Sequence, residues 1–175
     1  GRGGEEAQTL IQAEIPLRIL PGISAGIGGL AYAGIPVTHR DVNQAVTFLT
    51  GHDRTGLAPS AINWQGIADS SQVIVMYMAI KHLPEICDHL IKAGRNPSEP
   101  VAVVSNASLP NMSVLETTLS QAAEDVLIHQ ITPPAIIAVG EVVRMRQCLD
   151  WVSHMHGAKP RNLDPLGTRQ HEDSA

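Results

Sequence analysis

The sequence predicts a layered α/β domain, in which helices cover both faces of a mixed sheet of roughly five strands. Continuous apolar runs occur at residues 73–78, 101–104 and 135–139, and such runs are typical of strands buried on both faces. Residues 83–91 place apolar side chains at the spacing of one helical face, between two of those runs. Strands that alternate with helices in this way indicate a covered sheet. Ligands of such sheets lie beyond the carboxyl ends of the strands, so residues 50–52, 77–79, 105–108 and 140–141 are candidate positions beside a ligand.

The first part of the chain predicts two helices joined by an extended segment. Residues 5–12 have a helical apolar pattern, and residues 16–20 favour an extended conformation before a Pro-Gly turn. Ser24 is a plausible N-cap of a second helix over residues 25–33. Three glycines within that helix each cost about 1 kcal/mol relative to alanine. We therefore expect another part of the protein to pack very close to its backbone.

The remaining elements predict one domain and its flanking segments. We expect residues 43–153 to form the C-terminal αβα domain, and residues 154–175 to be a polar, disordered tail. The predicted order within the domain is strand 46–49, helix 62–68, strand 73–78, helix 83–91, strand 101–104, strand 114–119, helix 120–128, strand 135–139 and a short helix toward Trp151.

Composition excludes several classes of partner. The formal net charge is −5 and aromatic residues make up 3% of the chain, which argues against nonspecific nucleic-acid binding. No apolar run reaches the length of about 18 residues that indicates a membrane span. Two cysteines do not make a disulfide framework, so we expect a cytoplasmic protein. The eight histidines form no recognised ligand spacing, and we expect no metal site.

Three local patterns have alternative interpretations. The opening GRGGEE could bind an anion at a helix N-terminus with help from Arg2, or it could be a surface turn. Residues 22–26 match the spelling GxSxG, but they lack the buried strand and the oxyanion segment of a hydrolase. A nicotinamide-dependent oxidoreductase would need a complete glycine fingerprint after a strand, and none is present.

A set of segments in the same order resembles the uroporphyrinogen-III C-methyltransferases, members of the tetrapyrrole methylase family. These segments are GRGGEE (1–6), LPGISA (20–25), AYAGIPVTHR (31–40), TGH (50–52), VMYM (75–78), VVSNAS (103–108) and AVGEVV (138–143). The resemblance implies two α/β domains with a cleft for S-adenosyl-L-methionine between them. It further implies that residues 1–42 are the C-terminal remnant of the N-terminal domain together with the interdomain linker. It also implies a homodimer that transfers two methyl groups in turn to uroporphyrinogen III. The product, precorrin-2, leads to cobalamin and sirohaem.

The resemblance also assigns site residues. Ser24 and Ala25 match a cofactor-binding pair, Met78 is expected beside adenine and the substrate, and Ala107 stands where the family usually has glycine. Ala135 and Ile136 are expected to offer backbone groups to adenine. Arg2 matches an arginine that pairs with substrate carboxylates, and Arg40 is a second candidate for that role.

No catalytic residue is expected within these 175 residues. Because the first strand and loops of the family are missing, we expect a C-terminal portion that is nearly inactive alone. Two alternatives stay open, namely a non-catalytic dimerisation or docking module and another tetrapyrrole (precorrin) methylase.

Overall fold

The central feature of the protein is a mixed sheet of five strands. The computed structural model describes residues 3–52, 56, 59 and 61–168. Adjacent strands β1 and β2 run parallel, and the other neighbouring pairs are antiparallel, which confirms the predicted mixed sheet. The order across the sheet is β1 (Thr47–Thr50), β2 (Ile74–Tyr77), β5 (Ala135–Val139), β3 (Pro100–Ser105) and β4 (Ser113–Thr118).

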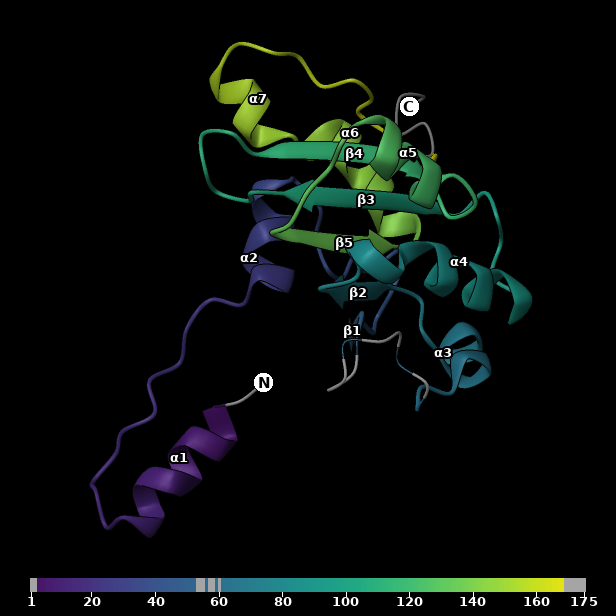
Figure 1. The fold of residues 1–175 in the computed structure, drawn as a ribbon. Coiled ribbons are helices and arrows are strands. Elements are labelled where there is room, and N and C mark those ends of the chain that lie inside the picture. The colour runs from purple at the N-terminus through teal and green to yellow at the C-terminus, as the bar shows by residue number, and fades with distance from the viewer. Residues whose placement is uncertain (1–2, 53–55, 57–58, 60, 169–175) are drawn as a thin grey trace.

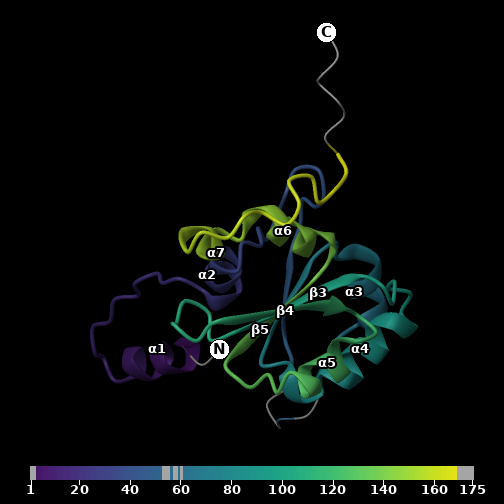
Figure 2. The same ribbon diagram turned by 90° about the horizontal axis from the view of Figure 1, so that it is seen from above.

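Helices cover both faces of this sheet, as Figures 1 and 2 show. One face carries α3 (Trp64–Ser70), α4 (Leu83–Lys92) and α5 (Ala122–Ile128). The other carries α2 (Ala25–Tyr32), α6 (Arg146–Leu149) and α7 (Trp151–Met155). Short 3₁₀ turns, η1 (Ile80–His82) and η2 (Glu141–Met145), follow β2 and β5. Among the described residues, no helix has the length and apolar character needed to span a bilayer.

Each central strand divides its side chains between two cores. Along β2, Ile74 and Met76 pack toward α4 and α5, whereas Val75 and Tyr77 belong to the cluster that contains Leu30 of α2. Strands β3 and β5 alternate in the same way. Successive side chains of a strand point to opposite faces, so a continuous apolar run is what two covered faces require. The apolar runs in the sequence thus correspond to the centre of the sheet.

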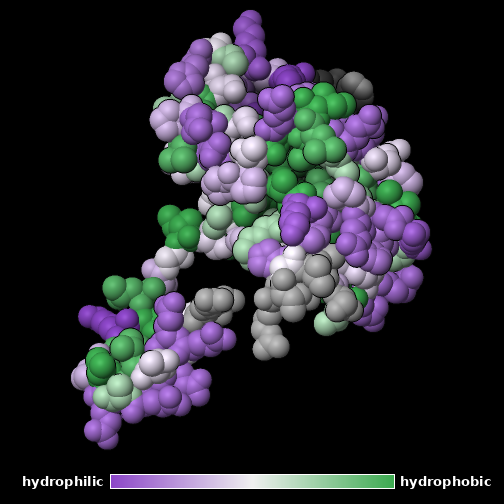
Figure 3. All heavy atoms as spheres, viewed as in Figure 1, coloured by the Kyte–Doolittle hydropathy of each residue, from purple (hydrophilic) through white to green (hydrophobic). Residues whose placement is uncertain are grey.

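The first helix stands apart from both cores. Helix α1 (Gly3–Gln12) has no buried residue, and Ile11 is 64% exposed. An irregular segment over residues 13–24 joins it to α2, and Figure 1 shows this segment running away from the sheet. Figure 3 shows apolar and polar side chains mixed on the lobe that α1 forms. The boundary predicted at residue 42 stays a prediction.

The segment after β5 folds back along the sheet. Helix α7 crosses the boundary predicted at residue 153 and ends at Met155. Farther along, the backbone N–H of Arg161 donates to the carbonyl oxygen of Gln147 at 2.9 Å. The Arg161 guanidinium also pairs with Glu116 of β4. Residues 169–175 of the predicted tail lie outside the described residues.

Candidate functional site

A cavity of about 580 Å³ lies at the edge of the sheet where β2 and β3 end and β5 begins. Its volume falls within the range of about 300–1,000 Å³ that is common for small-molecule sites. Mostly apolar side chains line it, with a few polar groups among them. The lining residues are Ala25, His52, Tyr77, Met78, Ile80, Lys81, Val104, Asn106, Ala107, Leu109, Pro133, Pro134, Ala135 and Ile136.

The cavity brings together five of the six residues expected to bind the cofactor. Ala25 comes from the start of α2, Met78 follows β2, Ala107 follows β3, and Ala135 and Ile136 begin β5. The sixth, Ser24, immediately precedes Ala25. Residues distant in sequence thus meet at one edge because the strand ends that carry them are neighbours in the sheet. Their role as cofactor contacts stays a prediction.

The two residues expected to bind substrate are not placed in this cavity. Arg2 lies outside the described residues. Arg40 is exposed in a turn between His39 and Asn43, which form an isolated antiparallel bridge, and it does not line the cavity. Its role stays a prediction as well.

One sequence-based expectation about the sheet edge is wrong. Gly140 follows β5, and the carboxyl end of each strand was expected to border the ligand site. Because β5 runs antiparallel to both of its neighbours, its carboxyl end lies at the opposite edge, and Ala135 at its start borders the cavity instead.

The strand ends singled out in the sequence contain three polar residues of the cavity, His52, Tyr77 and Asn106, whereas sequence reasoning missed a fourth, Lys81. His52 lies with its Nε2 atom 3.2 Å from the sulfur of Met78. Lys81 is exposed in the 3₁₀ turn that follows β2 and gives the lining a positive charge. The signal that could have found Lys81 is its position four residues after the end of a buried strand.

The start of α2 is fastened to the end of β2 through the hydroxyl of Tyr77. The backbone N–H of Gly26 donates to Tyr77 Oη at 2.9 Å, and Ser24 Oγ forms a short hydrogen bond with the same oxygen. A Cβ atom on Gly26 would lie 2.3 Å from Tyr77 Oη. The close packing predicted for the glycine-containing helix is therefore confirmed, and Tyr77 is the residue that approaches.

Three of the five described non-glycine residues with a positive φ lie in the loops that follow β2 and β3, beside the cavity. Met78, Asn106 and Ser108 have φ angles of 54°, 50° and 68°, in the left-handed region that non-glycine residues rarely adopt. Ala107 lies between two of them, and a Cβ on Gly29 would approach its methyl group to 3.1 Å. Strained backbone persists where the surrounding structure imposes it, and it is concentrated at binding sites.

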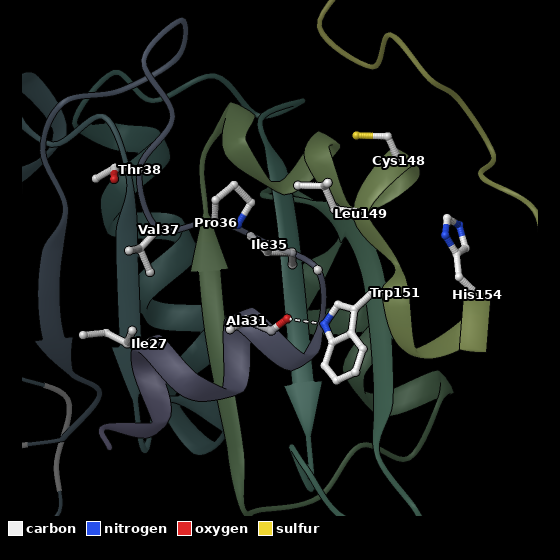
Figure 4. Close-up of a pocket in the computed structure, with 11 residues that line it drawn as sticks. Ile27, Ala31, Ile35, Pro36, Val37, Thr38, Cys148, Leu149, Trp151 and His154 are labelled. Carbon is white, nitrogen blue, oxygen red and sulfur yellow. Dashed lines mark hydrogen bonds between the residues drawn. The ribbon is translucent and has the colours of Figure 1, made fainter. Parts of the chain in front are cut away.

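A second cavity, of about 630 Å³, lies between α2 and the segment of α6 and α7, as shown in Figure 4. Ile27 and Ala31 of α2 line it together with Leu149 and Trp151. The indole Nε1–H of Trp151 donates to the carbonyl oxygen of Ala31 at 2.8 Å and holds α7 against α2. His154 also lines this cavity, and its buried Nε2 atom has no hydrogen-bond partner among the described residues.

The described residues offer little acid–base or metal chemistry. Among them, no group of three or more His, Cys, Asp or Glu side chains is arranged to hold a metal ion. Burial raises the pKa of the Cys87 thiol to about 11, so this cysteine is a core residue and not a nucleophile. The first cavity is suited to binding and orienting a ligand.

Comparison with known proteins identifies the family. Tetrapyrrole (corrin/porphyrin) methylases match residues 1–123. The chain belongs to this family. Among curated tetrapyrrole methylases, a uroporphyrinogen-III C-methyltransferase from Sinorhizobium sp. is 62% identical over 169 residues, which are 97% of this chain and 60% of that protein. A siroheme synthase from Acinetobacter baylyi is 45% identical over 87% of this chain and 33% of its own length.

The fold agrees with this membership. The crystal structure of uroporphyrin-III C-methyl transferase from Thermus thermophilus, complexed with S-adenosylhomocysteine, superposes with a TM-score of 0.70 at 31% identity. That match covers 82% of this chain and 61% of the other. The chain thus spans about 60% of the length of these methyltransferases and about a third of the siroheme synthase.

Proposed function

We propose that this tetrapyrrole methylase chain serves the S-adenosyl-L-methionine-dependent C-methylation of uroporphyrinogen III. Two successive transfers would give precorrin-2 for the synthesis of cobalamin or sirohaem. The observation that carries the proposal is the 62% identity to a uroporphyrinogen-III C-methyltransferase over almost the whole chain. The cavity adds independent support, because it gathers Ala25, Met78, Ala107, Ala135 and Ile136 in one place.

The residues of the cavity fit the proposed cofactor. Ile136, Pro134 and Val104 supply apolar surface suited to the faces of an adenine ring. At the start of α2, the backbone N–H of Ala25 and the hydroxyl of Ser24 are suited to the carboxylate of the methionine part, because helix N-termini favour anions. S-adenosylhomocysteine, the product, has the same adenosyl and carboxylate groups.

In the proposed reaction the protein mainly positions the two reactants and shields them from water. When bound, the cofactor supplies an electrophilic methyl group on a sulfonium sulfur. A pyrrole carbon would take that methyl in line, so that one C–C bond forms as one S–C bond breaks, and the positive charge then left on the tetrapyrrole would be removed by loss of a proton to solvent. Met78, at the mouth of the cavity, and the apolar lining exclude water and fix the approach. This proposal requires no metal and no covalent nucleophile.

The substrate carries eight carboxylates, so the site needs basic groups. Lys81 borders the cavity and is the group best placed to contact a substrate carboxylate. Arg2 and Arg40 remain our candidates for further carboxylates. The rest of the cleft is proposed to come from the part of the relatives' length that this chain does not span.

A methyl-transfer assay tests the proposal. A polypeptide that carries these residues and also supplies the remaining length of the relatives is incubated with methyl-labelled cofactor and uroporphyrinogen III. We expect two labelled methyl groups per tetrapyrrole, and near inactivity for the 175-residue chain alone. Label transfer to a precorrin but not to uroporphyrinogen III would favour the alternative of another tetrapyrrole methylase, and no transfer to either would favour the docking module.

We further propose that the enzyme is a cytoplasmic homodimer. The surface around the second cavity supports a partner, because it exposes Ile27, Leu149, Trp151 and Met155 by 51%, 42%, 42% and 74%. The free cysteines Cys87 and Cys148 support a reducing compartment. Sedimentation of the wild type beside a Trp151→Ser variant tests the dimer. A monomeric wild type would contradict it.

A further inference from the structure

The first turn of α2 is capped in an unusual way. Ser24 occupies the N-cap position with an extended backbone (φ −82°, ψ 136°), and its carbonyl oxygen accepts from the N–H of Gly28 at 2.8 Å. A serine at this position normally accepts a hydrogen bond on its side chain from the second or third helical N–H. The Ser24 side chain makes no such bond. The N–H of Gly26, the second helical residue, donates to Tyr77 Oη instead.

Two hydrogen bonds meet at Tyr77 Oη, and only one of them has a fixed direction. A backbone N–H can only donate, so Tyr77 Oη accepts from Gly26, whereas either hydroxyl could be the donor between Tyr77 and Ser24. We assign the phenol as the donor to Ser24 Oγ, because no other described residue accepts the phenol hydrogen. In that arrangement no described residue accepts the hydroxyl hydrogen of Ser24, which is therefore available to a ligand beside Ala25. Hydrogen bonds linked in a chain strengthen one another.

We propose that Tyr77 is a positioning residue that takes over the capping of α2 and thereby orients the Ser24 hydroxyl as a donor to the cofactor carboxylate. The binding part of this inference rests on the proposed function. Without Tyr77, Ser24 would turn back to cap Gly26, as serines at N-caps ordinarily do. The Ser24 hydroxyl would then be lost to the ligand.

Strand pairing and a ring contact hold Tyr77, and with it the phenol hydroxyl, in place. Tyr77 is the last residue of β2 and pairs with Thr50 on one side and Ile136 on the other. Its ring lies 6.2 Å from that of Phe48 in a tilted contact. The next residue along the chain is Met78, so one strand end positions both Met78 and, through the phenol, Ser24. The phenol of Tyr77 thus joins the start of α2 directly to the sheet.

A double-mutant cycle tests the binding part. Calorimetry measures the affinity for S-adenosylhomocysteine of the wild type, Ser24→Ala, Tyr77→Phe and the double variant, in a polypeptide of full family length. We expect each single change to weaken binding about five- to tenfold. The double variant should bind no more weakly than either single one, because both changes remove the same donor. Additive losses would overturn the inference.

The matched control is Tyr32→Phe, which removes the hydroxyl at the other end of α2. Tyr32 packs its ring 5.4 Å from Trp151, away from the cavity. This variant should bind S-adenosylhomocysteine as the wild type does. A loss equal to that of Tyr77→Phe would show that the effect comes from general weakening of α2 and would overturn the positioning role.

Amide hydrogen exchange tests the capping assignment without any cofactor. We expect Ser24→Ala to leave the exchange rate of the Gly26 amide within about threefold of the wild type, and the double variant to accelerate it about tenfold or more. If Ser24→Ala alone accelerates exchange tenfold, Ser24 is the cap and the inference is wrong. If the wild type binds no S-adenosylhomocysteine, the proposed function fails, and exchange alone decides whether Tyr77 caps α2.

Discussion

Replacing Gly26 with alanine tests the packing between α2 and the end of β2. The new methyl group would lie 2.3 Å from Tyr77 Oη, 2.8 Å from Tyr77 Cζ and 2.9 Å from Phe48 Cε1. These separations are far below van der Waals contact, so the tyrosine ring has to move. Moving it breaks the hydrogen bond that Oη accepts from the Gly26 N–H and the one that it shares with Ser24 Oγ.

The expected magnitude is the sum of three effects. Overpacking of this kind costs about 1–3 kcal/mol. The lost hydrogen bond of the Gly26 N–H costs about 1 kcal/mol more, and the bond of the exposed Ser24 hydroxyl adds little because water can replace it. Alanine in place of glycine within a helix stabilises the fold by about 1 kcal/mol, which offsets part of this loss. We therefore predict that Gly26→Ala lowers the free energy of unfolding by about 2 kcal/mol, taking the middle of the overpacking range.

Urea denaturation followed by circular dichroism measures this change, and Gly28→Ala is the matched control. A Cβ on Gly28 would meet Cγ2 of Ile23, whose side chain is 92% exposed and able to move aside. The control should therefore be neutral or stabilising by up to about 1 kcal/mol. If Gly26→Ala proves as stable as Gly28→Ala, Tyr77 does not pack on α2 as described.

Three further predictions concern a buried thiol, a buried ion pair and the charged rim of the cavity. Relative to Cys87→Ala, wild-type stability should fall by about 1–3 kcal/mol between pH 9 and 11, because the folded-state pKa of about 11 exceeds the ordinary value of 9.0. Arg95→Met should lower the free energy of unfolding by about 3 kcal/mol, because it leaves the Glu99 carboxylate, which is 12% exposed, without its cation. Denaturation curves at lower pH should show that acidification restores part of this stability. Lys81→Met should raise the KM for the tetrapyrrole about three- to tenfold while cofactor affinity stays constant.

The sign of the Glu99 effect follows from burial. Burial raises the pKa of Glu99, while the charge of Arg95 and its hydrogen bond oppose that rise. Without Arg95 the pKa would rise further, so the fold would favour the protonated carboxyl of Glu99 more strongly. The stability that Arg95→Met loses relative to the wild type is then smallest at low pH and grows as the pH rises. A variant equally unstable at every pH would contradict this reasoning.

The strands and most helices could be predicted because their signals are local. The apolar run at residues 135–139 marks a buried strand wherever that strand sits. Its direction depends on pairing with β2 and β3, which are remote in sequence, and so the expectation that Gly140 borders the site was wrong. The pattern around Ser24 likewise predicted the N-cap position correctly.

The candidate site shows the same division between local and distant signals. Short motifs led to Ala25, Met78 and Ala107, and the fold places all three around one cavity. The capping role of Tyr77 was missed because its hydrogen bond to Ser24 joins residues 53 positions apart, and no local pattern records such a contact. Lys81 was missed because an exposed lysine in a turn is ordinarily solvated.

A crystal structure of the family-length polypeptide with S-adenosylhomocysteine tests the central claim most directly. We predict that the adenosyl group occupies the cavity at the ends of β2 and β3, against Ala107 and Ile136. The carboxylate should accept hydrogen bonds from the N–H of Ala25 and the hydroxyl of Ser24. Density for the ligand in the cavity beside Trp151, or none with ligand at saturating concentration, would contradict the assignment of this site.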